Sequence, residues 1–195
     1  PAALFDTLAQ GCKSGGATTT AIKLADDVVT EAGVGADMGA EKFFDIKCRK
    51  AGLSPDCVVL VATIRALKMH GGVKKEDLKK ENLQALEAGM SNLQRHVENI
   101  KKFGLPAVVS INRFSADTDA EINLVKEKCK ALGVEALMAD HWAMGGEGAA
   151  AAAKAVVKTS DDHQSKEKVP RPDEIARVDK ASTNASEDDQ TRTAH

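Results

Sequence analysis

Short apolar runs alternate with amphipathic stretches through residues 1–157, and this alternation constrains the fold more than any other feature of the sequence. The clearest run is CVVLVAT at 57–63, which is continuously apolar and rich in β-branched residues. Such a run is typical of a strand buried on both faces of a parallel sheet. Similar runs predict further strands at 28–30, 106–112 and 134–139.

Amphipathic spacing predicts the helices that separate these strands. They are expected over 18–27 (with Thr18 as its cap), 40–52, 76–103, 117–132 and 146–157. Strand and helix alternate four times, which implies right-handed crossovers and an α/β fold with a parallel sheet and flanking helices. From Lys158 onward charged and polar residues dominate. We therefore expect an α/β core over 1–157 and a disordered C-terminal tail over 158–195.

Charge and composition exclude several classes of function. The chain has 27 basic and 29 acidic residues, so it lacks the basic field that attracts nucleic acid. No apolar run approaches the 18 residues or so needed to span a membrane, and Pro1 opens a segment unlike a signal peptide. The sequence thus predicts a cytoplasmic protein with no membrane or nucleic-acid partner. A start at Pro1 rather than Met also fits a fragment or a processed chain.

The four cysteines, Cys12, Cys48, Cys57 and Cys129, are scattered and form no CxxC pair. Metal sites use cysteines at closer spacing, and disulfide scaffolds have more cysteines for their length. We therefore expect these four thiols to be reduced and to bind no metal.

In an open parallel sheet, ligands bind beyond the carboxyl ends of the strands, so the residues just after each strand are candidates. Glu31 follows 28–30, where it could hold a metal or its water, or serve only as a cap or solvated turn residue. Arg65 and Lys68 follow 57–63, where they could hold phosphate or carboxylate oxygens. They could also be simple exposed cations.

Two aromatic residues follow the next two strands. Phe114 lies just after 106–112 and Trp142, the single tryptophan, just after 134–139. Rings at neighbouring strand ends could grip a flat heterocycle, since base–aromatic stacking contributes about 1–3 kcal/mol per ring. Alternatively, they could plug the top of the sheet.

Common nucleotide motifs are missing. No GxxxxGK[ST] phosphate loop occurs, and Gly33 and Gly35 are followed by Gly39, which does not give the dinucleotide pattern GxGxxG. These glycines could still let the backbone approach a ligand closely. An unrelated α/β hydrolase or dehydrogenase finds no supporting motif.

Several consecutive segments together resemble the formate–tetrahydrofolate ligase family. They are TEAGVGADMGAEKFFDIKCR, VATIRALKMHGGV, ENLQALEAGMSNLQRHVENIKKFGLPAVVSINRF, DTDAEI and DHWAMGGEG. The likeness runs from about residue 3 to 157 and corresponds to a central third or so of the family's length.

The resemblance implies a P-loop NTPase-like core and a ligase of one-carbon metabolism. It implies that formate and ATP (with Mg) give a formyl phosphate, which formylates tetrahydrofolate at N10. These small molecules are the expected partners, with a homo-oligomer as the expected assembly. By the same resemblance, Phe114 and Trp142 flank a pterin or adenine. Glu31, Asp37 and Lys42 lie in one signature, and Arg65 and Lys68 in another, both expected to line the active cleft.

Two departures from the family pattern matter. Ser115 stands where the family has proline, which should loosen the Phe114 loop because a fixed φ is lost. The family's phosphate loop lies outside the matched segments, so we expect the isolated chain to be inactive as a ligase. The alternative is a non-catalytic module that binds folate or nucleotide, or that associates with other subunits.

Overall fold

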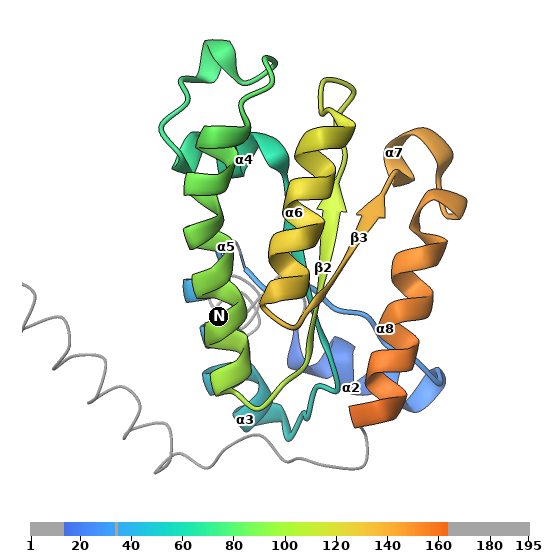
Figure 1. The fold of residues 1–195 in the computed structure, drawn as a ribbon. Coiled ribbons are helices and arrows are strands. Elements are labelled where there is room, and N and C mark those ends of the chain that lie inside the picture. Colours follow the sequence, from blue (N-terminus) through green and yellow to red (C-terminus); the bar gives the residue numbers. More distant parts are fainter. Residues whose placement is uncertain (1–13, 34, 164–195) are drawn as a thin grey trace, which may run out of the picture.

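A three-stranded parallel sheet forms the centre of the computed structural model, which describes residues 14–33 and 35–163. The strands are β1 (Val58–Ala62), β2 (Ala107–Asn112) and β3 (Glu135–Ala139), in the spatial order β1-β2-β3 (Figure 1). The predicted α/β fold with a parallel sheet is confirmed.

Helices connect and cover the strands. The α-helices are α2 (Gly15–Leu24), α3 (Arg49–Ala51), α4 (Ile64–His70), α5 (Leu83–Lys102), α6 (Asp119–Ala131), α7 (His141–Met144) and α8 (Ala150–His163). Two π-helical segments, Gly35–Ala40 and Phe43–Cys48, precede α3, and short 3-10 turns occupy Lys75–Asp77 and Glu147–Ala149.

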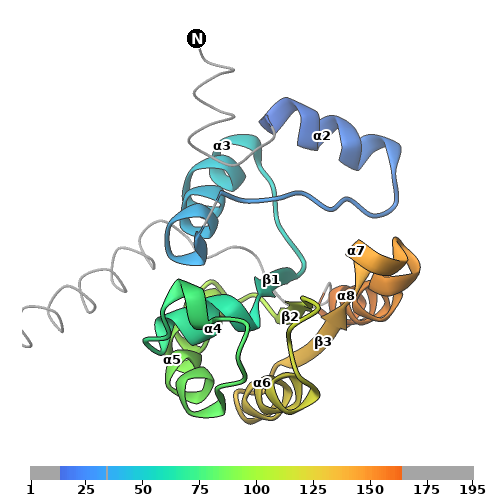
Figure 2. The ribbon, with the colours of Figure 1, turned by 90° about the horizontal axis from the view of Figure 1, so that it is seen from above.

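Helices α4, α5 and α6 lie together along one side of the sheet, and α8 lies beyond β3 (Figure 2). Helix α8 contacts β2 and β3, whereas α5 contacts β1 and β2. The central strand β2 is buried from Ala107 to Ile111. The core between sheet and helices contains Leu86, Val97, Ile100, Val109 and Val125, all fully buried. Burial of this aliphatic surface is the main driving force for the fold.

Strand β1 differs from the sequence prediction. The run at 57–63 was expected to be buried on both faces, but Val59 is 39% and Val61 68% exposed. The reason is that packing covers only the Leu60 and Ala62 face of β1, and the opposite face, which carries Val59 and Val61, is left open in the described residues. The apolar run therefore predicts the strand correctly, but the prediction that both of its faces are buried is wrong.

The strand predicted at 28–30 is also wrong. These residues form no strand, and Val29 is 88% exposed. Three residues are too few to specify a strand by themselves, and their backbone groups pair with no strand in the described chain. The parallel sheet thus has three described strands rather than four.

Helix boundaries depend on caps that apolar spacing alone did not reveal. Helix α2 begins after Ser14, whose Oγ accepts a hydrogen bond from Ala17 N, so the cap is Ser14 rather than Thr18. Helix α5 begins at Leu83 rather than near 76, because Asn82 Oδ1 accepts from Ala85 N. The predicted stop at Gly52 is confirmed, with φ of +64°.

Helix α8 runs to His163 and so crosses the boundary expected at residue 157. Residues 158–163 contain no Gly or Pro, so the helix can extend one hydrogen bond at a time. The remainder of the tail, 164–195, lies outside the described residues.

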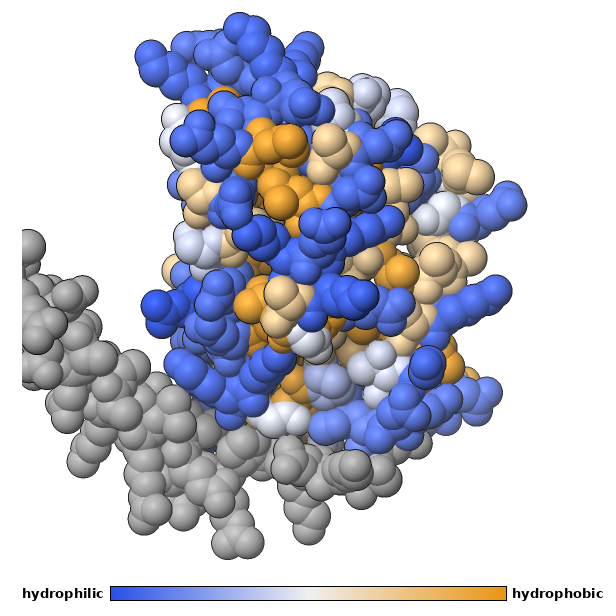
Figure 3. Space-filling view, viewed as in Figure 1, coloured by the Kyte–Doolittle hydropathy of each residue, from blue (hydrophilic) through white to orange (hydrophobic). Residues whose placement is uncertain are grey.

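The outer surfaces of α5, α6 and α8 are largely hydrophilic, and apolar atoms show mainly in the seams between them (Figure 3). None of the helices in the described part of the chain combines the length and the apolar character that a bilayer-spanning segment needs.

Candidate functional site

The carboxyl ends of β2 and β3 lie level with each other, which brings their following loops to one edge of the sheet. Asn112 pairs in register with Ala139, and Arg113 N donates a hydrogen bond to Ala139 O at 3.3 Å. Phe114 and Trp142 follow these paired ends by two and three residues. The sequence analysis expected the two aromatic loops at one edge, and they are found there.

The two rings differ in their surroundings. Phe114 is 37% exposed, whereas Trp142, on the short helix α7, is 90% exposed. The two rings do not contact each other in the described structure, whose aromatic pairs all involve Phe43, Phe44 and Phe103. A side chain as exposed as Trp142 does not plug the sheet, so that alternative fails for this residue.

Arg65 contacts the Phe114 ring. Its guanidinium carbon lies 4.7 Å from the ring centroid, within the range of a cation–π interaction. Arg65 is in the first turn of α4, directly after β1, so this contact joins the loops that follow β1 and β2. Arg65 was predicted either to hold oxygens of a ligand or to be a simple exposed cation, and in this structure it contacts an aromatic ring.

The Phe114 loop is a tight turn closed from both ends. Asp117 N donates to Phe114 O at 3.0 Å, and Phe114 N donates to Asp117 Oδ2 at 2.8 Å. Ser115 and Ala116 are the two central residues of this turn, and Ser115 is exposed. Ser115 therefore occupies the turn position at which proline is favoured, which gives the departure from the family pattern a structural meaning.

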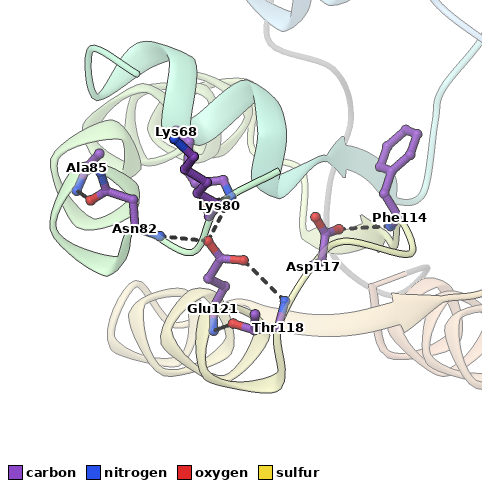
Figure 4. A network of polar contacts seen from close by, with 8 residues as sticks. All are labelled: Lys68, Lys80, Asn82, Ala85, Phe114, Asp117, Thr118 and Glu121. Atoms are coloured by element: carbon purple, nitrogen blue, oxygen red, sulfur yellow. Dashed lines mark hydrogen bonds and ion pairs between the residues drawn. The ribbon is translucent and has the colours of Figure 1, made fainter. Parts of the chain in front are cut away.

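Lys68 is fully buried and already has protein partners. Its Nζ donates to Glu121 Oε1 at 2.8 Å and to the carbonyl oxygen of Lys80 at 2.9 Å (Figure 4). An ammonium group removed from water requires such partners, since an unpaired buried charge is very costly. Both the ligand-binding role and the exposed-cation alternative had Lys68 accessible, and it is not accessible in this structure.

Glu121 joins three segments of the chain. Besides Lys68, its Oε1 accepts from Asn82 N at 3.2 Å, and its Oε2 accepts from Thr118 N at 3.2 Å. Glu121 N in turn donates to Thr118 Oγ1, which completes a capping box at the start of α6. Glu121 thereby holds α4, the start of α5 and the start of α6 together below the Phe114 turn.

The two buried carboxyl groups have pKa values shifted in opposite directions. Burial alone would raise the pKa of Glu121, but the hydrogen bonds from Lys68, Thr118 and Asn82 outweigh it and lower the pKa. Burial raises the pKa of Asp117, the Phe114 N–H opposes this shift, and the nearby charge of Glu121 adds to it. Asp117 is only 6% exposed, and its Oδ1 has no hydrogen-bond partner.

Glu31, Asp37 and Lys42 are all exposed. Their side chains form no hydrogen bond or ion pair with the Arg65–Phe114 pair or with Trp142 within the described residues. Gly39 does make a close backbone approach, but to Gly33, since an added Cβ would overlap the Gly33 carbonyl oxygen. The glycines of this loop thus pack against each other.

Sequence reasoning missed Asp117 and Glu121. The Thr118-x-x-Glu121 pattern was available as a capping-box signal, but nothing in a single sequence shows that Glu121 also meets Lys68, 53 residues away. Asp117 and Glu121 both lie in DTDAEI, one of the segments that resemble the ligase family, but no role was predicted for either residue. In the described residues, no three His, Cys, Asp or Glu side chains are grouped so as to hold a metal ion.

The parallel sheet with flanking helices defines the chain as an α/β protein, with polar and aromatic loops at the carboxyl edge of the sheet. The chain belongs to the formate–tetrahydrofolate ligase family, whose model matches residues 2–187. The match reaches beyond the 3–157 expected from the sequence, so the charged tail shares in the likeness.

Curated relatives agree with this assignment. The formate–tetrahydrofolate ligase of Methylococcus capsulatus is 65% identical over 161 residues, which are 82% of this chain and 29% of that protein. Those of Granulibacter bethesdensis and Sinorhizobium medicae are 55% and 57% identical, over 94% and 88% of this chain. They are covered over 32% and 30% of their own length, so the chain spans about a third of these relatives.

Proposed function

We propose that this chain forms the part of a formate–tetrahydrofolate ligase that binds a planar heterocycle, the pterin of tetrahydrofolate or the adenine of ATP. The observation that carries the proposal is the pairing of Asn112 with Ala139, from which the loops bearing Phe114 and Trp142 leave the same sheet edge. Both rings are accessible there, and aromatic faces stack on flat heterocycles.

Formate, tetrahydrofolate and ATP are the proposed substrates of the complete ligase, and N10 of tetrahydrofolate is the proposed acceptor. Phosphoryl transfer depends on positioning and charge around the phosphates, and this sequence has no GxxxxGK[ST] loop. The ATP of the complete ligase is proposed to bind with Mg, and we assign no Mg ligand among the described residues, where no three His, Cys, Asp or Glu side chains are grouped. We therefore propose ligand binding without formylation for this chain alone. Cytoplasmic location remains a prediction.

Titration of ATP and of tetrahydrofolate into the purified chain tests the heterocycle site. Trp142 is the single tryptophan, so quenching of the intrinsic fluorescence reports directly on its ring. Phe114→Ala and Trp142→Ala are each expected to weaken binding by about 1–3 kcal/mol, or roughly 5- to 150-fold, measured by calorimetry.

Met69→Ala and Met144→Ala are the matched controls. Both methionines are more than half exposed, Met69 on α4 and Met144 on α7 beside Trp142. They should leave both affinities unchanged. Equal affinities for the two ring variants and the wild type would assign the rings a structural role only.

The second candidate, association with a further copy, is favoured by one face of β1. Its apolar Val59 and Val61 side chains are exposed there, and exposed apolar surface is typical of protein–protein contacts. Val61→Lys is expected to lower the sedimentation mass if copies pair there. Val157→Lys, at a 46% exposed valine on α8, is the control. A monomeric wild type would remove this candidate.

A further inference from the structure

The Phe114 side chain is held from two directions. Its backbone N–H is bound by Asp117 Oδ2 at 2.8 Å, and its ring is covered by Arg65 at 4.7 Å. The backbone contact comes from the residue just before the α6 cap, and the ring contact comes from the first turn of α4. In Figure 4 the Phe114 ring points away from the polar network that holds its loop.

Asp117 is poorly satisfied for so buried a residue. It is 6% exposed, yet Oδ1 has no partner, and burial raises its pKa. Leaving a buried polar atom unpaired opposes folding, so the side chain is retained at a cost. The Asp117 side chain closes the turn at Phe114 through its bond to Phe114 N, and this turn carries the Phe114 ring.

The segments that carry Arg65 and Asp117 are held together by a buried ion pair. Lys68 on α4 is bonded to Glu121 on α6, so the helix that bears Arg65 cannot shift relative to the segment that bears Asp117 without breaking a buried ion pair. The exposed part of the Phe114 ring is left for another planar group.

We propose that Asp117 is a positioning residue which, together with Arg65, fixes the Phe114 ring for stacking on a pterin or adenine. This proposal rests on the heterocycle site proposed above. Asp117 acts on the loop backbone and Arg65 on the ring. Arg65 covers part of the ring, and the remaining exposed surface is open to a flat ligand. Neither residue is proposed to take part in bond making.

The test uses the full chain with Asp117→Ala, Asp117→Asn and Arg65→Gln. In the free protein, nuclear Overhauser contacts between the Phe114 ring and the Arg65 side chain should be present in the wild type. They should persist in Asp117→Asn, because the amide oxygen still accepts from Phe114 N. They should vanish in Asp117→Ala. Asp119→Ala, at an exposed residue whose side chain reaches only Arg113 in the described residues, at 3.9 Å, is the control and should leave the contacts of the Phe114 ring in place.

Affinity for ATP and for tetrahydrofolate is the second measurement. Asp117→Ala and Arg65→Gln should each lose about fivefold or more for the heterocycle that stacks there, and Asp117→Asn should restore binding. The two probes tell adenine from pterin. If the wild type binds neither ATP nor tetrahydrofolate, the proposed heterocycle site is wrong. The nuclear Overhauser contacts of the Phe114 ring would still test whether Asp117 positions that ring.

Unchanged ring contacts and Phe114 amide shift in Asp117→Ala would overturn the proposal. If Asp117→Ala does not fold, Arg65→Gln decides, since it leaves the turn intact. Wild-type affinity in Arg65→Gln would then overturn the proposal.

Discussion

Lys68 Nζ and Glu121 Oε1 lie 2.8 Å apart, with both side chains wholly removed from solvent and 53 residues between them in the sequence. This ion pair is the polar centre of the described structure, because it joins α4 to α6 beneath the loop that presents Phe114. It is a structural link that the sequence pattern did not reveal.

Lys68→Met should destabilise the protein by about 3–5 kcal/mol, because it leaves the Glu121 carboxylate buried without its counter-ion. The double variant Lys68→Met/Glu121→Gln should recover part of this loss, since Gln is neutral and its single Oε1 can still accept from either Asn82 N or Thr118 N. Urea unfolding measures both. Lys80→Gln, at a fully exposed side chain that pairs with Asp77, is the control and should be neutral. Additive losses in the double variant would contradict this role for the pair.

Gly89→Ala should destabilise the protein by about 1–3 kcal/mol, although Ala usually stabilises a helix relative to Gly. A Cβ at Gly89 would overlap the carbonyl oxygen of Leu67, where α5 crosses α4. Thermal unfolding gives the sign. Gly16→Ala in α2 meets only Ser14 Oγ at 4.0 Å, so the same change should there stabilise by up to about 1 kcal/mol.

Ser115→Pro should stabilise the protein by about 0.4–1 kcal/mol, because proline suits the first central position of the turn and restricts the unfolded chain. Ala116→Pro is the matched control one residue further on. It should destabilise, since proline is disfavoured at the second central position. Equal effects of the two substitutions in urea unfolding would show that the turn does not form as described.

Asp117→Asn should gain stability relative to the wild type as the pH rises from about 3.5 to about 7. The folded-state pKa of Asp117 is raised above its ordinary value of 3.8. Its contribution is therefore complete below that value and is lost as the pH rises through the folded pKa. Asn resembles the protonated acid and does not incur this loss.

Glu121 acts in the opposite sense. Its lowered pKa gives stability that is present above its ordinary value of 4.5 and is lost as the pH falls through the folded pKa. Both forms of the protein contain Glu121, so the difference between Asp117→Asn and the wild type isolates Asp117. Unfolding free energies across this pH range provide the measurement, and a difference that does not vary with pH would argue against the raised pKa.

The sequence was most informative where periodicity and local signals agree. The runs at 57–63, 106–112 and 134–139 became β1, β2 and β3, and parallel topology followed from their alternation with helices. The edge at which Phe114 and Trp142 lie could also be predicted, because every parallel strand ends there.

What could not be predicted depends on partners distant in the chain. Lys68 follows a strand as a ligand-binding cation would, and only the fold shows that Glu121 neutralises it. The second face of β1 was predicted to be buried because apolar content does not tell which faces of a strand are covered. Arg65 was expected among ligand oxygens, and its contact with Phe114 depends on how two loops meet in space.

The close crossing of α4 and α5 has a consequence for motion. Gly71 and Gly89 let the two backbones touch, as a Cβ on Gly71 would overlap Ala85 O and one on Gly89 would overlap Leu67 O. Helices this close cannot slide or rotate against each other without atomic overlap. Helix α4 therefore keeps a fixed position relative to α5. Any adjustment when a ligand arrives must then fall to the segments after β2 and β3, and hydrogen exchange should slow there first.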